Sequence, residues 1–220
     1  MPALEAGWID RDLAAELPGF ELIWTRVDAR AGRTPRPLRK RMRELANRIT
    51  GAHVVQLRQD EVPWAYRVLW RRLGLDPDSE RTPVERLMVE RLRSGGLRSH
   101  GMPADAATVA TLETGVPIAV FDSASLDGTP GLRPAASGET LADGGDERAL
   151  RAGEVVIADE RRPIARLTGE AAPDCLADRR TTSMLVCALA AAGVSRLALE
   201  EAIWTTAELL RGAGTLEEPS

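Results

Sequence analysis

The segment at residues 82–128 constrains the fold most, because a helix with readable ends leads through a polar turn into a short apolar run. Thr82 is a good N-cap, Pro83 suits the first helical position, and Glu85 would complete a capping box. A glycine pair after this helix can supply the left-handed residue that ends it. The apolar run at 116–121 is short and ends at an aspartate, which predicts a buried strand. The turn between this helix and this strand is therefore the first place to expect a pocket.

Elsewhere, short helical and strand patterns alternate along the chain. Apolar residues at helical spacing predict helices near 35–50, 63–74 and 196–211, and alternation or short apolar runs predict strands at 20–27, 51–57, 154–158 and 163–167. In the helix near 63–74, Trp64, Val68 and Leu73 are expected to face inward. The pattern does not decide whether Trp70 faces the core. The apolar segment at 181–192 fits either a strand or a buried helix. These elements predict an α+β fold, with a mixed, mostly antiparallel sheet or barrel-like core flanked by helices.

Composition narrows the class of protein. The chain has 220 residues, of which 44% are hydrophobic, enough for one large domain with an ordinary core. The net charge of −4 is the opposite of what a dedicated nucleic-acid-binding domain usually carries, so tight non-specific binding is not expected and DNA is not an expected partner. No apolar run approaches the roughly 20 residues needed to span a membrane. The N-terminal residues carry no signal-peptide pattern, so we expect a soluble cytoplasmic protein without a membrane partner.

Standard catalytic and cofactor motifs are absent from the sequence. It contains no phosphate-binding loop, no GxSxG, no HExxH and no CxxC. Cys175 and Cys187 belong to no cysteine or histidine cluster, so reduced buried thiols are expected rather than a zinc site. We therefore expect no cofactor and no metal.

One segment is strongly basic, although the chain as a whole carries a net negative charge. Residues 26–48 hold nine basic and two acidic side chains. On the helix at 35–50, Arg36, Arg39, Lys40 and Arg43 lie opposite the apolar face and are candidate RNA-binding residues, since phosphate is the obvious anion to meet them. The alternative is an ordinary solvated helix face in an arginine-rich chain.

A set of polar residues around the central segment is the best candidate for a small-molecule site. Its members are His100, Asp105, Thr108, Glu113 and Asp122, with Asp159 and Thr181 as completions. A histidine near a carboxylate can act as a general base for a water molecule that attacks an ester. The alternative is that the aspartates serve turns, that Asp105 caps the following helix and that His100 is a surface residue.

Several segments occur together in a characteristic order. They are YRVLWRRLGLDP at 66–77, TPVERLMVERLRSGG, LETGVPIAVFD followed by LDG, GEVVIADERRPIAR at 153–166, and the pair Thr181 and Thr182. In order and spacing they resemble the B3/4 domain, which occurs in the beta subunit of phenylalanyl-tRNA synthetase and as stand-alone proteins. The resemblance implies a single B3/4-like domain at 1–220, with an N-terminal extension at 1–58 that carries the basic helix, a core at 59–192, and a closing helix and tail at 193–220.

The resemblance also implies a kind of site. In the synthetase, the domain is similar to a proofreading compartment that removes tyrosine from the wrong tRNA. Its pocket is built from backbone groups and small residues, with a histidine after the proline of the central strand and a Gly-Gly-Glu run. Here these positions fall on Ala119 and on the Ala-Ala-Pro run at 171–173, and the family's Asp-x-x-Asn turn keeps Asp105 but has Thr108 for asparagine. The scaffold is thus matched without the editing side chains, and His100 and Glu170 are the nearby substitutes.

Three functions follow from these patterns. The first is a stand-alone domain that binds tRNA, aminoacyl-tRNA or an amino-acid-like small molecule and acts as a trans-acting deacylase, with no ligase activity. The second is a non-catalytic module for an amino acid or a protein. The third is an unrelated enzyme that uses His100 with Asp105 or Asp122. For the first, the substrate-binding candidates are Asp105, Thr108, Glu113, Ala119, Asp122 and Thr181, and the catalytic candidates are His100 and Glu170.

Overall fold

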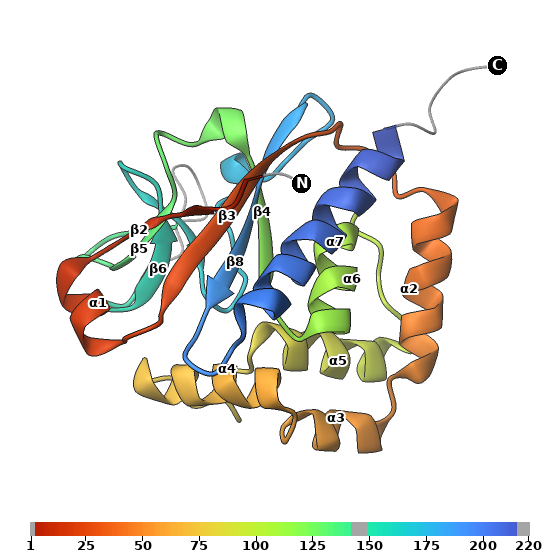
Figure 1. Cartoon of the computed structure of the whole chain (residues 1–220), viewed down its shortest axis with the longest axis horizontal. Coiled ribbons are helices and arrows are strands. Elements are labelled where there is room, and N and C mark those ends of the chain that lie inside the picture. Colours follow the sequence, from red (N-terminus) through yellow and green to blue (C-terminus); the bar gives the residue numbers. More distant parts are fainter. Residues whose placement is uncertain (1–2, 142–148, 215–220) are drawn as a thin grey trace.

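The strands form two layers (Figure 1), and the computed structural model describes residues 3–141 and 149–214. Within these residues, one antiparallel four-stranded sheet has the order β1 (Glu5–Ala6), β3 (Glu21–Asp28), β8 (Ser183–Ala190) and β4 (Ile118–Asp122). A second four-stranded sheet has the order β2 (Trp8–Ile9), β5 (Gly131–Pro134), β6 (Val155–Ala158) and β7 (Pro163–Arg166), and only β2 and β5 are parallel. The predicted α+β fold with mixed, mostly antiparallel strands is confirmed, and the described strands do not close into a barrel.

Helices cover one face of the first sheet. In Figure 1, α6 (Ala104–Thr114) and α7 (Arg196–Gly214) lie beside this sheet, and α2 (Arg36–Arg48) lies outside them. The remaining helices are α1 (Arg11–Glu16), α3 (Gly51–Leu57), α4 (Glu61–Arg72) and α5 (Pro83–Ser94). Apolar side chains of α2, α6 and α7, including Met42, Val109 and Ile203, form one buried cluster with those of the first sheet, including Val186. The helices predicted near 35–50, 63–74 and 196–211, and the helix predicted to follow Thr82, are therefore confirmed.

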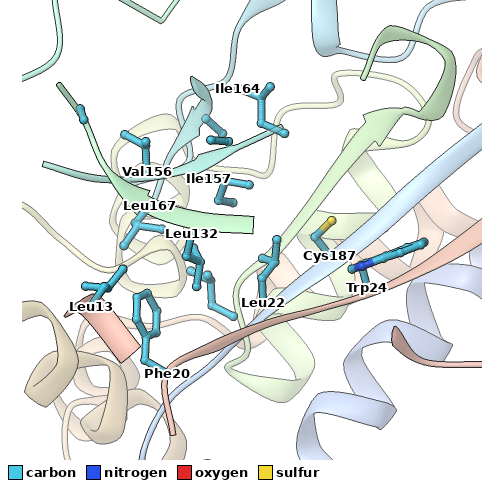
Figure 2. Close-up of a cluster of buried hydrophobic side chains, with 14 of the residues drawn as sticks. Leu13, Phe20, Leu22, Trp24, Leu132, Val156, Ile157, Ile164, Leu167 and Cys187 are labelled. Atoms are coloured by element: carbon cyan, nitrogen blue, oxygen red, sulfur yellow. The ribbon is translucent and has the colours of Figure 1, made fainter. Parts of the chain in front are cut away.

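The second sheet covers the opposite face of the first. Leu22 and Cys187 of the first sheet join Leu132 and Ile157 of the second in one buried cluster (Figure 2). The first sheet is thus buried on both faces, and for that reason β8 is apolar at nearly every position and shows no strand periodicity. The structure resolves the open prediction for 181–192 in favour of a strand.

The strand predicted at 51–57 is wrong, because this segment forms helix α3. The hydroxyl of Thr50 accepts a hydrogen bond from the backbone N–H of His53 at 3.2 Å and caps the helix. Val54 and Leu57, three residues apart, are buried against Val84 and other apolar residues of a small separate cluster. A good N-cap and a helical pair of apolar residues therefore outweigh the strand propensity of two adjacent valines.

The buried face of α4 also differs from the prediction. Trp64 and Val68 are 48% and 38% exposed, whereas Trp70 is completely buried together with Tyr66. The guanidinium carbon of Arg71 lies 5.4 Å from the centre of the Trp64 ring, so this ring is covered by a cation at the surface. The prediction that Trp64 and Val68 face the core is wrong.

The start of α5 is not the capping box that its sequence predicts. Gly95 ends the helix in the left-handed conformation with φ of 77°, as predicted. Thr82, however, makes no capping hydrogen bond with its side chain. Glu85 is buried and accepts a hydrogen bond from Arg67 of α4 at 2.7 Å. Glu85 is therefore used to join two helices rather than to cap one.

Candidate functional site

A cavity of about 390 Å³ opens where three loops meet beside the start of α2. It is lined by residues 31–34, 99–102 and 177–179 and by Arg39 of α2. The backbone N–H of Met102 donates to the carbonyl oxygen of Gly32 at 2.9 Å, which joins the first two loops. Gly101 has φ of 84°, and a Cβ there would lie 3.0 Å from the same carbonyl oxygen, so this junction favours glycine.

Asp105 holds two of these loops in place from inside the protein. Its side chain is completely buried in the first turn of α6. One carboxylate oxygen, Oδ2, accepts hydrogen bonds from the hydroxyls of Thr34 and Ser99, both at 2.5 Å. The other oxygen, Oδ1, accepts from the backbone N–H of His100 at 2.8 Å. Asp105 does not line the cavity and is not the cap of α6, which begins after Pro103, so its contacts are those of a positioning residue.

Positive charge predominates on the walls of the cavity. The side chains of Arg33, Arg39 and Arg179 are exposed there, and none of them forms an ion pair with a described residue. His100 lines the same cavity and is also exposed. The carboxylate residue in the lining is Asp178, and one of its oxygens accepts from the backbone N–H of Arg180 at 2.7 Å. Guanidinium groups that line one cavity suit an anion with several acceptor oxygens.

Arg39 connects the cavity with the basic face of α2. Arg36 and Arg43 precede and follow it by three and four residues, so these side chains share one helix face, and all are exposed. Lys40 is 3.7 Å from Glu44 on the same helix, an exposed pair that leaves its charge accessible. The predicted basic surface thus runs along α2 and continues into the cavity.

The other predicted site residues lie at separate places. Glu113 receives two hydrogen bonds from Arg41 of α2, at 2.8 and 2.5 Å. Asp122 accepts from the hydroxyl of Thr181 at 2.6 Å at the end of β4. Thr108 is half-buried on α6 and does not line this cavity.

Two further candidates are Ala119, which lies on β4 of the first sheet, and Glu170, which follows β7 of the second sheet. Ala119 packs against the apolar cluster between the sheets, on the face of β4 opposite to that of Val120, which packs with the helices. Glu170 forms an ion pair with Arg166 of β7 at 3.0 Å. Asp159, proposed as a completion, is buried and accepts from backbone N–H groups of its own turn. Neither Ala119 nor Glu170 lines the cavity beside His100.

Arg33, Ser99 and Arg179 line the cavity but are not singled out by sequence patterns. They belong to loops far apart in the chain; the hydroxyls of Thr34 and Ser99, for example, are 3.2 Å apart and 65 positions apart in sequence. The signal nearest to them is the basic character of residues 26–48, which includes Arg33. Only the closed fold shows that these side chains share one cavity.

Both cysteines are poor candidates for a nucleophile. Cys175 and Cys187 are buried, and neither is bonded to the other. Burial raises the pKa of the Cys175 thiol to about 11 and also raises that of Cys187, so both stay protonated at neutral pH. Within the described residues there is also no group of three or more histidine, cysteine or acidic side chains that could hold a metal ion.

A second cavity of about 200 Å³ lies between residues 73–75, 151–155 and 167–168. Its charged groups are already paired: Arg151 donates to Glu80 at 2.8 Å, and Glu154 accepts from Arg166 at 2.7 Å. The arginines of the cavity beside His100 form no ion pair with any residue that the structure describes, so this cavity is the better candidate for a site.

Comparison with protein families shows which family the chain belongs to. A model of the B3/4 domain matches residues 65–196, which is more than half of the chain. The chain belongs to the B3/4 domain family. The resemblance to the domain found in the beta subunit of phenylalanyl-tRNA synthetase is thereby confirmed. A comparison with curated proteins found no match.

Only some of the residues that line the cavity lie within the segment that matches the B3/4 domain. Residues 99–102 and 177–179 lie inside the matched segment, whereas residues 31–34 and Arg39 lie before it. The part of the lining that includes Arg39 of α2 thus comes from residues that precede the matched segment. None of the helices in the described part of the B3/4 protein is long and apolar enough to cross a lipid bilayer.

Proposed function

We propose that this B3/4 protein binds the acceptor end of an aminoacyl-tRNA, or the amino acid that such an end carries. The phosphates contact the basic face of α2, and the end of the RNA lies toward the cavity beside His100. The single observation that supports this proposal is the continuity between the exposed arginines of α2 and those in the cavity, with Arg39 common to both and no described residue forming an ion pair with Arg36, Arg39 or Arg43. Membership of the B3/4 family, a domain of a tRNA synthetase, also supports the proposal that the protein binds tRNA.

The charge distribution limits how RNA would bind. The net charge of the chain is −4, so the attraction is local to α2 rather than a property of the whole surface. Binding through a few phosphate contacts weakens steeply with salt, because each neutralised phosphate releases condensed cations. We therefore expect moderate affinity with a strong salt dependence.

The test is a tRNA gel-shift titration at several salt concentrations with the double variant Arg36→Ala/Arg43→Ala. We expect weaker binding and a salt slope reduced by about one for each side chain removed. Arg93→Ala is the matched control, because Arg93 is exposed on α5 and has no ion-pair partner among the described residues. No shift with the unchanged protein, or equal binding by the double variant, would remove the proposal.

Ester hydrolysis is the finer part of the proposal. His100 is the candidate general base: it would take a proton from water, the water oxygen would attack the ester carbonyl, and the ribose oxygen would leave with a proton. Glu170 is held by Arg166 near β7, so hydrolysis would depend on His100 alone. Incubation with a panel of mischarged tRNAs measures this activity, and His100→Gln should abolish it while tRNA binding persists.

A non-catalytic binding module is the second candidate. It is favoured by the replacement of the family's editing side chains, since Ala119 and the run at 171–173 carry no group that can transfer a proton. In that case tRNA or an amino acid binds without loss of the ester above background, and His100→Gln changes neither result.

A further inference from the structure

The lining of the cavity beside His100 includes two kinds of group, called here the basic wall and the Ser99 wall. The basic wall consists of Arg33, Arg39 and Arg179, whose guanidinium groups only donate hydrogen bonds. The Ser99 wall consists of Ser99, whose hydroxyl is bonded to the buried Asp105. A ligand that uses both kinds of group must carry both an anion and a hydrogen-bond donor.

The donor requirement follows from the contacts of Ser99. Its hydroxyl and that of Thr34 are each 2.5 Å from Oδ2 of Asp105, and a carboxylate oxygen accepts hydrogen bonds. Each hydroxyl has only one proton, which is used in this contact, so Ser99 offers the cavity lone pairs only. No arginine or lysine among the described residues forms an ion pair with Asp105. This wall therefore favours a hydroxyl or ammonium donor.

We propose that this cavity binds the phosphate and ribose of a ribonucleotide. The phosphate accepts from the three guanidinium groups, and a ribose hydroxyl donates to Oγ of Ser99. A volume of about 390 Å³ is within the range of small-molecule sites. Asp178 also lines the cavity, but one of its carboxylate oxygens accepts from a backbone N–H, and three arginines line the same cavity.

A phosphate suits the basic wall better than the carboxylate of a free amino acid does. Its terminal oxygens point in several directions and can accept from guanidinium groups on different loops, whereas the two oxygens of a carboxylate lie in one plane and are satisfied by a single arginine fork. Arg33, Arg39 and Arg179 line the cavity from a loop, from helix α2 and from a second loop, so they present three separate guanidinium groups rather than one fork. Inorganic phosphate would leave the Ser99 wall unused.

This inference does not depend on the RNA contact proposed above, because the same chemistry occurs in a free nucleotide and in the last nucleotide of an RNA. The experiment is calorimetric titration of the full chain with adenosine 5′-monophosphate, its 2′,3′-dideoxy analogue, inorganic phosphate and a free amino acid. A short RNA with a free 3′-terminal ribose is the fifth ligand. Tighter binding of this RNA than of the mononucleotide identifies RNA as the source, and the reverse order identifies a free nucleotide.

Separate substitutions test the contribution of the arginines and that of Ser99. Arg39→Ala/Arg179→Ala should weaken every phosphate ligand at least about tenfold, because charge-assisted hydrogen bonds are lost. Ser99→Ala should abolish the preference for the ribose over the dideoxy analogue, a preference that we expect to be about 3- to 10-fold for one hydrogen bond. Ser99→Thr keeps the hydroxyl and should keep the preference. Arg48→Ala is the control, since Arg48 is exposed on α2 but does not line the cavity.

Several results would overturn the inference. They are no binding of the mononucleotide at millimolar concentration, equal affinities for the ribose and dideoxy forms, no effect of the two arginine substitutions, or binding of the amino acid instead. Thermal unfolding of each variant shows whether it is folded, and the Ser99→Thr and arginine variants keep the test decisive even where Ser99→Ala is unstable. Loss of tRNA binding on Arg36→Ala/Arg43→Ala with nucleotide binding unchanged would separate the two proposals.

Discussion

Two tryptophans of α4 differ in what their side chains contribute to stability. Trp70 is completely buried, whereas Trp64 is 48% exposed under Arg71. We expect Trp70→Ala to lower the free energy of unfolding by about 3–5 kcal/mol, because it leaves a large cavity. Trp64→Ala should cost about 1 kcal/mol or less, as for a surface substitution that loses one cation–π contact. Urea unfolding of both variants measures the difference, and equal losses would contradict the burial described here.

The same helix shows why single side chains were hard to place from sequence. Trp64 and Val68 are one turn apart, and so are Tyr66 and Trp70. Both pairs satisfy helical periodicity, so the pattern predicts a helix correctly but gives two competing apolar faces. Only the packing of α4 against the sheets decides that Tyr66 and Trp70 are covered. Residue-level assignments on such helices need the tertiary contacts.

Among pairs of elements, α4 and α5 are joined by a buried ion pair. Arg67 and Glu85 are 4% and 1% exposed and 2.7 Å apart, and Arg58 also approaches Glu85 at 3.4 Å. We expect Arg67→Met to destabilise the protein by about 3–5 kcal/mol, because Glu85 would remain buried without its closest cation. The double variant Arg67→Met/Glu85→Met should recover most of this loss, since neither charge is then buried. Urea unfolding of the single and double variants tests the coupling, and additive losses would show that no coupling exists.

The sequence signals at the ends of helices differ in how well they predict the structure. The left-handed glycine that ends α5 was predictable, because only Gly95 can adopt that conformation there without strain. The capping box was not formed, since the nearby guanidinium of Arg67 competes for Glu85. At 51–57, two adjacent valines suggested a strand, and the cap supplied by Thr50 was the stronger signal. Short segments are thus decided by partners that local patterns do not contain.

For the whole molecule, the N-terminal part of the chain contributes a buried strand to the first sheet. The B3/4 match begins at residue 65, yet β3 lies between β1 and β8 in the centre of the first sheet. Its side chains Leu22, Ile23 and Trp24 are buried. We expect a fragment of residues 59–220 to lack cooperative unfolding, because β8 would become an exposed apolar edge. Circular dichroism during heating tests this, and a sharp transition near that of the full chain would show that the matched core folds alone.

The overall class was predictable, and the site was only partly so. The order of capped helix, strand and hairpin was enough for an α+β fold and for the family, because those features are local in sequence. The basic face of α2 was also visible, since its spacing is regular. The cavity was not, because Arg33, Ser99 and Arg179 come together only when three distant loops close around Asp105.

The position of β3 has a consequence for how the chain is made. Asp28 of β3 pairs with Ser183 of β8, 155 positions later, and the two strands remain paired over eight residues. Long-range pairing of this kind forms slowly, because a long loop must close before any contact rewards it. During translation, β3 cannot complete its pairing with β8 until residue 190 has left the ribosome. Until then Leu22, Ile23 and Trp24 remain uncovered, and a nascent-chain chaperone has its longest opportunity to bind them.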